Sequence, residues 1–166
     1  FIMELAEWNT VYGLRGNCDN LVSEFVAARG EEERFYRHYV DVWRDRCLLV
    51  QMGHAAGFET RGPEELPALR EVVRARFGPE LAFLEAMPEI LLTPDYLFVH
   101  GGVADEAHLE GLDAWKCIKN DDFLSQGHSF RRWCIVGHWP VTLYRTGAPC
   151  CAPLIHRGRK IASIDG

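Results

Sequence analysis

Three short stretches of the sequence end an apolar run in side chains that could hold a metal ion or a phosphate. The first, VYGLRGNCDN, spans residues 11–20 and brings together an arginine, an amide, a thiol and a carboxylate. The second, YLFVHGGV, continues into His100, and the third, WCIVGHWP, places His138 after a glycine. Imidazole nitrogens and an amide oxygen suit a divalent cation such as zinc, manganese or iron. One hypothesis is therefore a cation shared by Asn17, His100 and His138.

Each of these residues taken alone has a purely structural interpretation. Asn is a common turn former, and a histidine at a strand end can simply bond to the backbone or cap its strand. The metal hypothesis depends on one context that occurs three times. Glycines beside each polar residue let the backbone approach a bound group, and open α/β folds collect ligands at the ends of their strands.

The elements that would position these residues are strands separated by a long helical stretch. Apolar runs predict a short buried strand at Thr10–Leu14, later strands within residues 90–94, 96–103 and 133–140, and a hairpin over residues 153–166 that turns near Arg157 and Gly158. Helical spacing predicts one apolar stripe of Phe35, Tyr39, Val42 and Trp43, and further helices over residues 63–77 and 80–87. This order favours one α/β or α+β domain with a helical insertion at about residues 21–88.

Length and charge limit the classes of function. The chain has 166 residues, enough for one domain with a core, and its net charge of -6 argues against a non-specific nucleic-acid binder. No apolar run is long enough to span a bilayer, and no signal peptide is evident. Six scattered cysteines without a CxxC pair favour reduced thiols and a cytoplasmic protein.

The stretches RGNCD, VHGGV and VGHWP, in this order, resemble the later motifs of the calcineurin-like metallophosphoesterase superfamily. The resemblance is to the phosphoprotein phosphatase and diadenosine-tetraphosphatase-like branch, whose pattern is RGNH and an acid, then HGG or HAG, then GHTP. It implies a metallophosphatase-type β-sandwich flanked by helices. The superfamily's earlier motifs, GDxHG and GDxxDRG, are absent from this sequence. We therefore expect residues 1–166 to be the later part of a single metallophosphatase domain and to be inactive by themselves.

The resemblance also implies a dinuclear metal site, with manganese, iron or zinc as the ions. Asn17, His100 and His138 would be ligands of one ion, and a metal-bound water or hydroxide would be the nucleophile. These three ligands are neutral, so the carboxylates of such a site would come from the earlier motifs. Asp165, at the end of the last predicted strand, is the one local acid that could substitute.

Residues that would contact the substrate follow from the same resemblance. Arg15 would bind a phosphate oxygen through its planar guanidinium. Cys18 stands where the phosphoprotein branch has its proton-donating histidine, and Asp19 would orient the group at that position. A thiol can donate a proton but suits the task less well than imidazole. Because the family has a second phosphate-binding arginine between its HGG and GH motifs, Arg131 and Arg132 are further substrate-binding candidates.

The function expected first is hydrolysis of a phosphoric ester, most like that of a serine/threonine protein phosphatase, on a phosphoprotein or a nucleotide. Two alternatives stay open. Cys18 could have weakened catalysis in a phosphatase-like module that is kept for binding. A related branch of small phosphodiesterases also carries GNCD, which favours phosphodiesterase or dinucleotide polyphosphatase activity instead.

Overall fold

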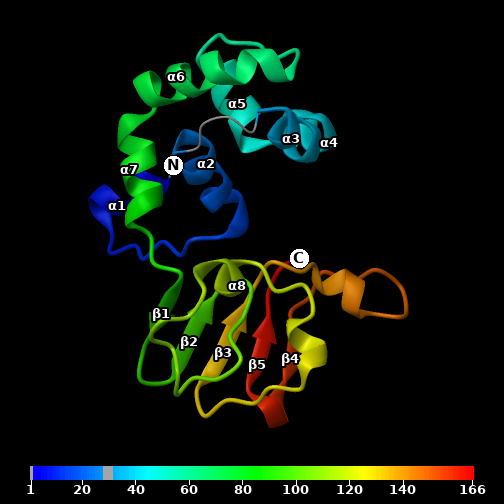
Figure 1. Cartoon of the computed structure of the whole chain (residues 1–166). Coiled ribbons are helices and arrows are strands. Elements are labelled where there is room, and N and C mark those ends of the chain that lie inside the picture. Colours follow the sequence, from blue (N-terminus) through cyan, green and yellow to red (C-terminus); the bar gives the residue numbers. More distant parts are fainter. Residues whose placement is uncertain (1, 28–31) are drawn as a thin grey trace. The chain divides into compact units, whose positions relative to one another are not determined.

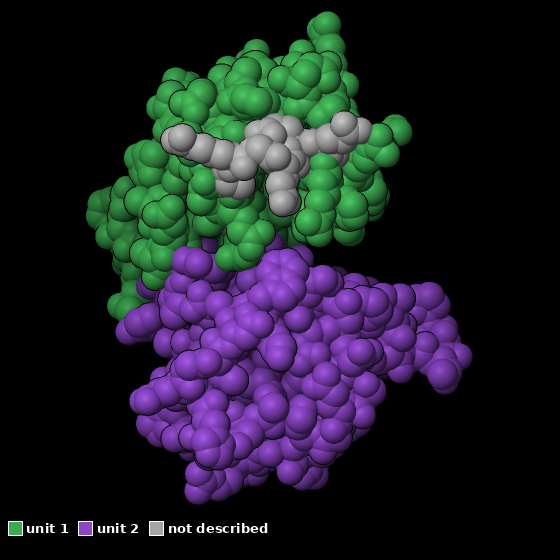
Figure 2. Space-filling model, in the orientation of Figure 1, with its two compact units in different colours: residues 1–10, 18–86 green, residues 11–17, 87–166 purple. Residues whose placement is uncertain are grey.

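The computed structural model describes residues 2–27 and 32–166, and the chain forms two compact units (Figures 1 and 2). Unit 1, green in Figure 2, comprises residues 1–10 and 18–86. Unit 2, purple in Figure 2, comprises residues 11–17 and 87–166. Within the described residues every strand lies in unit 2.

Unit 1 is built from helices. They are α1 (Ile2–Trp8), α2 (Asn17–Ala27, whose first residue belongs to unit 2), α3 (Glu32–Phe35), α4 (Asp41–Trp43), α5 (Leu48–Ala55), α6 (Leu66–Arg76) and α7 (Gly78–Ala86), with the π-helical turn η1 (Tyr36–Val40) and the 3₁₀ turns η2 (Arg44–Arg46) and η3 (Pro63–Glu65). This is the stretch in which the sequence predicts a helical insertion. Its core includes Phe25, Leu49 and Val73. Arg70 is buried there, and its Nε donates a 2.8 Å hydrogen bond to the carbonyl of Phe25.

Two of the helical predictions for unit 1 are confirmed and one is wrong in part. The helix predicted from Pro63 appears as η3 followed by α6, with Leu66, Leu69 and Val73 buried as the spacing requires, and the helix predicted next appears as α7. The predicted stripe through Val42 and Trp43 is wrong, because these side chains are 66% and 54% exposed. The π turn η1 holds more residues per turn than an α-helix, so it rotates the residues after it away from the expected face.

Unit 2 contains a five-stranded mixed sheet. Its strands are β1 (Ile90–Leu92), β2 (Tyr96–Val99), β3 (Trp133–Val136), β4 (Leu154–His156) and β5 (Ile161–Ser163), in the spatial order β1-β2-β3-β5-β4. The arrows of β2, β3 and β5 point the same way in Figure 1, and these three strands pair in parallel. The outer strands β1 and β4 pair antiparallel to their neighbours. The chain is therefore a mixed α and β protein, as its sequence predicts.

The register of the parallel strands brings their carboxyl ends to one edge of the sheet. Val99 of β2 pairs with Val136 of β3, which pairs with Ser163 of β5. Hydrogen bonding continues one residue further, where the N–H of Gly137 donates to the carbonyl of His100 at 2.9 Å. The residues that follow these three strands are thus held at the same edge.

One face of the sheet packs into the core of unit 2. Its buried strand residues are Leu97, Val99, Cys134, Val136 and Ile161, and they pack with Cys117 of α8 (Ala114–Ile118) and Phe123 of the 3₁₀ turn η4 (Phe123–Gln126). Two further 3₁₀ turns are η5 (Val141–Tyr144) and η6 (Arg157–Arg159), and the latter closes the predicted hairpin of β4 and β5. Within residues 2–27 and 32–166 there is one sheet, so the second layer of a sandwich stays a prediction.

The strand predicted at Thr10–Leu14 is wrong, since this segment has no regular secondary structure. A strand exists only where its backbone groups find a ladder of partners. The segment is interrupted by Gly13 and its Tyr12 side chain is exposed. At its end the N–H of Arg15 donates to the carbonyl of Pro88 at 2.9 Å, which fixes one point and forms no ladder.

None of the helices in the described part of the chain combines the length and the apolar character that a bilayer-spanning segment needs.

Candidate functional site

The side chains of Asn17, His100 and His138 meet at the carboxyl ends of β2 and β3 in unit 2. The Oδ1 atom of Asn17 lies 2.8 Å from Nε2 of His100 and 3.2 Å from Nδ1 of His138. The two imidazole rings are 5.4 Å apart between their centres and stand edge to face. The structure therefore brings together the three residues that the sequence nominates as ligands of one ion.

Glycine at position 16 makes this approach easy. Gly16 is buried against His100, and a Cβ atom at this position would lie 3.2 Å from three atoms of the imidazole ring. A Cβ atom at Gly137 would lie 3.5 Å from Nδ1 of His100, which is an ordinary contact. The glycine of RGN is thus where the backbone comes especially close to the ring that follows β2.

His138 occupies a strained turn directly after β3. Its φ of 66° is in the left-handed region that non-glycine residues seldom adopt. The N–H of Trp139 donates to the carbonyl of Gly137 at 2.9 Å, which closes a three-residue γ-turn around His138. Such a conformation costs about 1–3 kcal/mol and persists only where surrounding contacts hold it. In this chain it directs the His138 ring toward Asn17.

A carboxylate that the sequence did not nominate contacts the cluster from outside. Nε2 of His138 lies 2.6 Å from Oδ1 of Asp121, and the His138 side chain is only 7% exposed. Lys119 contacts the same carboxylate, with Nζ 2.9 Å from Oδ1 and 3.2 Å from Oδ2. The hydrogen bond from His138, together with Lys119, lowers the pKa of Asp121 below its ordinary value. Asp121 is therefore ionised at neutral pH.

The contacts of His138 place an oxygen acceptor opposite each ring nitrogen. A neutral imidazole has one N–H, so when Nε2–H donates to Asp121 the lone pair of Nδ1 faces the lone pairs of Asn17 Oδ1. This pairing is favourable when a cation lies between the two atoms, or when the Asn17 amide is turned so that its NH2 group donates to Nδ1. The contacts of His138 are thus compatible with those of a ligand of a shared ion.

Two of the three distances between the donor atoms are compatible with a shared ion, and both are also ordinary hydrogen-bond lengths. With bonds of about 2.1 Å, two ligand atoms lie about 3.0 Å apart at a right angle and about 3.4 Å apart at the tetrahedral angle. The observed 2.8 and 3.2 Å are close to these values. Among the residues that the structure describes, no group of three His, Cys, Asp or Glu side chains is arranged to hold a metal. The cluster is instead two histidines and one amide, a neutral set that lacks a carboxylate ligand.

Arg15 lies at the same end of the sheet. Its Nη1 is 3.6 Å from Oε1 of Glu89, the residue that precedes β1, and its side chain is 16% exposed. Ile90 of β1 pairs with Val99 of β2, so Glu89 is beside the point where β2 leads into His100. A guanidinium at this edge can offer its planar fork to a phosphate oxygen.

Arg131 and Arg132 are not brought to this edge. They precede Trp133, the first residue of β3, whereas His138 follows the last residue. Nη1 of Arg132 lies 3.1 Å from Oε2 of Glu106, whose side chain is 7% exposed, and Arg131 is 85% exposed. Burial opposes the charge of Glu106, but hydrogen bonds from the backbone N–H groups of both arginines and from the Arg132 guanidinium outweigh it and lower its pKa.

Cys18 and Asp19 belong to unit 1 and form part of the first turn of α2. Loss of water around the thiol, the negative charge of Asp19 and the neighbouring Cys47 together raise the pKa of Cys18. The thiol therefore stays protonated at neutral pH and releases its proton less readily than an ordinary cysteine. That property is unfavourable for a residue meant to protonate a leaving group.

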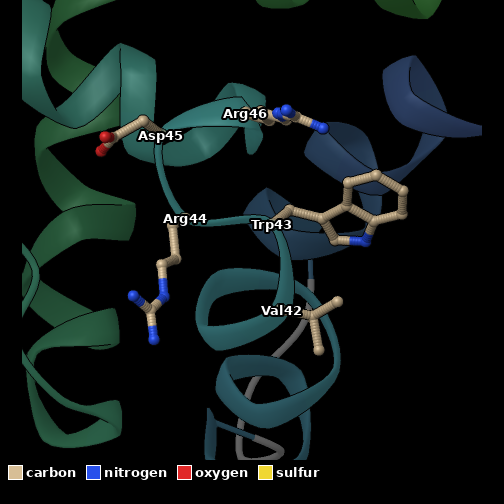
Figure 3. A pocket seen from close by; sticks show the side chains of 5 residues that line it. All are labelled: Val42, Trp43, Arg44, Asp45 and Arg46. Carbon is tan, nitrogen blue, oxygen red and sulfur yellow. The ribbon is translucent and has the colours of Figure 1, made fainter.

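Asp165 follows β5, and unit 1 has a hollow of its own. The carbonyl oxygen of Asp165 accepts a 2.7 Å hydrogen bond from the N–H of Val141. The hollow has a volume of about 380 Å³ and is lined by residues 42–46. Figure 3 shows the Trp43 and Asp45 side chains pointing to opposite sides, so this hollow offers no convergent set of polar groups.

No family model, curated protein or solved structure matches the chain.

Proposed function

We propose that the chain contributes the amide and histidine ligands of a metal-dependent phosphoric-ester hydrolase, most like a serine/threonine protein phosphatase. The observation that carries the proposal is the convergence of Asn17 Oδ1, His100 Nε2 and His138 Nδ1 within 2.8 and 3.2 Å at one edge of the sheet. The motif order RGNCD, VHGGV and VGHWP supports the same class of enzyme. The finer fold that belongs to this proposal is a metallophosphatase-type β-sandwich.

Each residue has a role that its own chemistry supports. Asn17, His100 and His138 would hold a divalent cation, which would supply Lewis acidity and lower the pKa of a water molecule at this edge. Arg15 would bind and orient a phosphate oxygen through two parallel N–H groups. Carboxylate ligands are needed beside these neutral donors, and the resemblance assigns them to the motifs GDxHG and GDxxDRG, which residues 1–166 do not contain.

The first test is binding of Mn²⁺, followed by paramagnetic broadening of the histidine ring resonances. This measurement shows which histidines lie near the ion, even where the site has a low affinity for it. We expect His100 and His138 to broaden first, and Asn17→Ala to abolish the selectivity. His54→Ala is the control, since His54 lies in α5 of unit 1. Equal broadening of all histidines would contradict the proposed site.

The second test is hydrolysis of 4-nitrophenyl phosphate by the protein at its natural length, in the presence of Mn²⁺. Asn17→Ala, His100→Ala and His138→Ala should each lower kcat/KM by about 100-fold or more, since even outer partners of metal ligands cost 10- to 100-fold when removed. Bis(4-nitrophenyl) phosphate as a parallel substrate separates phosphatase from phosphodiesterase activity. Hydrolysis that is unaffected by all three substitutions would show that the chemistry lies elsewhere.

The raised pKa of Cys18 favours a second candidate, a phosphatase-like module that binds a phosphorylated partner with little turnover. Under this alternative the three ligand residues hold the metal and Arg15 holds the phosphate, but the leaving group is poorly protonated. Selective Mn²⁺ broadening together with no detectable hydrolysis of either substrate is the result that this alternative predicts.

A further inference from the structure

We propose that Asp121 is a positioning residue that fixes the tautomer and the ring orientation of His138, so that its Nδ1 faces Asn17. The inference rests on the proposed function, which explains why such positioning would be useful. The contacts that support it come from the geometry of the cluster. Nε2 of His138 lies 2.6 Å from Oδ1 of Asp121, and Nδ1 lies 3.2 Å from Oδ1 of Asn17. The two ring nitrogens thus have different partners, and the ring has a defined direction.

The oxygen acceptor at 2.6 Å from Nε2 decides which nitrogen carries the proton. A carboxylate only accepts hydrogen bonds, so Asp121 requires an N–H at Nε2. In a neutral ring Nδ1 then carries the lone pair, which is the form in which a histidine can bind a cation. A carboxylate behind a metal-binding histidine has this effect in general and also raises the basicity of the ligand nitrogen.

The segment that carries Asp121 is itself held against Gly101, the residue after His100. The N–H of Gly101 donates to the carbonyl of Cys117 at 2.6 Å. A Cβ atom at Gly101 would lie 2.7 Å from the backbone N of Lys119 and 2.8 Å from that of Asn120. Glycine is therefore required there for residues 119–121 to approach, so the HGG stretch helps to place the carboxylate.

Lys119 gives the carboxylate a second partner. Its Nζ contacts both oxygens of Asp121, at 2.9 and 3.2 Å, while the Asp121 side chain remains 44% exposed. A partly exposed carboxylate is free to rotate unless something anchors it. Oδ1 contacts both Lys119 and His138, so Lys119, Asp121, His138 and Asn17 form one connected set of contacts.

The test is nuclear magnetic resonance of the metal-free chain with nitrogen-15 labelled histidine, at a pH where the ring is neutral. Wild-type His138 should carry its proton on Nε2, and that proton should be protected from exchange with water. Asp121→Asn, which keeps the shape and removes the charge, should lose the protection. Asp122→Asn is the matched control, because it removes one exposed carboxylate at the next position.

In the wild type, a proton on Nδ1 would overturn the inference. In Asp121→Asn, unchanged protection of the Nε2 proton from exchange would also overturn it. The same change in Asp122→Asn would also overturn it, as a general effect of charge. Binding of Mn²⁺ is measured on the same samples, and Asp121→Asn should weaken it about 10- to 100-fold. No Mn²⁺ binding by the wild type, with Nε2–H still protected, contradicts the proposed function and leaves the positioning role of Asp121 standing.

Discussion

The Nε2 atom of His100 lies 2.8 Å from the Oδ1 atom of Asn17, although 83 positions separate the two residues in the sequence. All of α3 to α7 lie between them. The long intervening stretch returns the chain to the same edge, where the carboxyl end of β2 meets the segment that leads into α2. The contact shows that RGNCD and VHGGV form one structural feature rather than two unrelated turns.

Arg15→Lys should lower turnover more than it lowers metal binding. Lysine keeps the positive charge but lacks the planar fork that holds two phosphate oxygens. We expect kcat/KM for 4-nitrophenyl phosphate to fall about tenfold or more, since one hydrogen bond to a charged group contributes about 1.5–3 kcal/mol. Broadening of His100 and His138 by Mn²⁺ should change little.

The matched control for this experiment is Arg131→Lys. Arg131 is 85% exposed and precedes β3, at the end of the strand opposite to His138. Its substitution should leave kcat/KM unchanged. Equal losses in the two variants would restore Arg131 as a substrate-binding residue, and an unchanged rate for Arg15→Lys would show that Arg15 does not contact the phosphate.

Cys18→His should preserve or raise monoesterase activity of the intact protein. The pKa of the Cys18 thiol is raised, whereas an imidazole has a pKa of about 6.5 and protonates a leaving group near neutral pH. A well-placed general acid contributes about 10²- to 10⁴-fold, so we expect a gain of up to about 100-fold. Cys151→Ser, at another exposed thiol, is the control. A melting temperature and a rate that fall together would mean that Cys18 is there for packing.

The sequence predicts the sheet edge well because the local signals are strong. Each of β2 and β3 is an apolar run that ends near a histidine and glycines, and the hairpin of β4 and β5 has a clear turn at Arg157 and Gly158. The strand predicted at Thr10–Leu14 is wrong for a physical reason. An apolar run becomes a strand only if a neighbour offers a hydrogen-bonding ladder, and no local pattern reports whether that neighbour exists.

Asp121 shows what sequence reasoning misses at a site. It lies in KNDDF, a polar stretch typical of a loop, with two adjacent acids and no periodic signal to distinguish them. Its partner His138 is 17 residues away, on the far side of β3. The contact that distinguishes Asp121 from Asp122 is the one with His138, which no local pattern reports. Arg131 and Arg132 are the reverse case, because they adjoin β3 in the sequence but lie at the end of β3 opposite to His138.

Glu106→Gln should destabilise unit 2 at neutral pH by about 1.5–3 kcal/mol, the contribution of hydrogen bonds to a buried charged group. The fold lowers the pKa of Glu106 from its ordinary value of 4.5. Its contribution is therefore complete above pH 4.5 and is lost as the pH falls through the lower folded-state pKa. Urea unfolding should show a large difference between wild type and variant at pH 7 and a smaller one at pH 3.

Glu110→Gln is the control for that measurement, because Glu110 is exposed. It should leave the unfolding free energy within about 0.5 kcal/mol of wild type at both pH values. A Glu106→Gln variant that is equally stable at pH 7 would show that the arginine backbone groups find other acceptors.

Gly16→Ala should weaken metal binding without a comparable loss of stability. A Cβ at Gly16 would lie 3.2 Å from Cε1, Nδ1 and Nε2 of His100, so the ring must shift by a few tenths of an ångström. Metal ligands tolerate errors of about 0.2 Å in their bond lengths, and we expect the Mn²⁺ affinity to fall about tenfold. The backbone at Gly16 has no positive φ, so alanine adds no strain there and restricts the unfolded chain.

Gly147→Ala is the matched control, since no atom lies within 4 Å of its Cβ position. Equal Mn²⁺ broadening of His100 and His138 in Gly16→Ala and Gly147→Ala would show that the close packing of Gly16 on the imidazole does not set the spacing of the ligands.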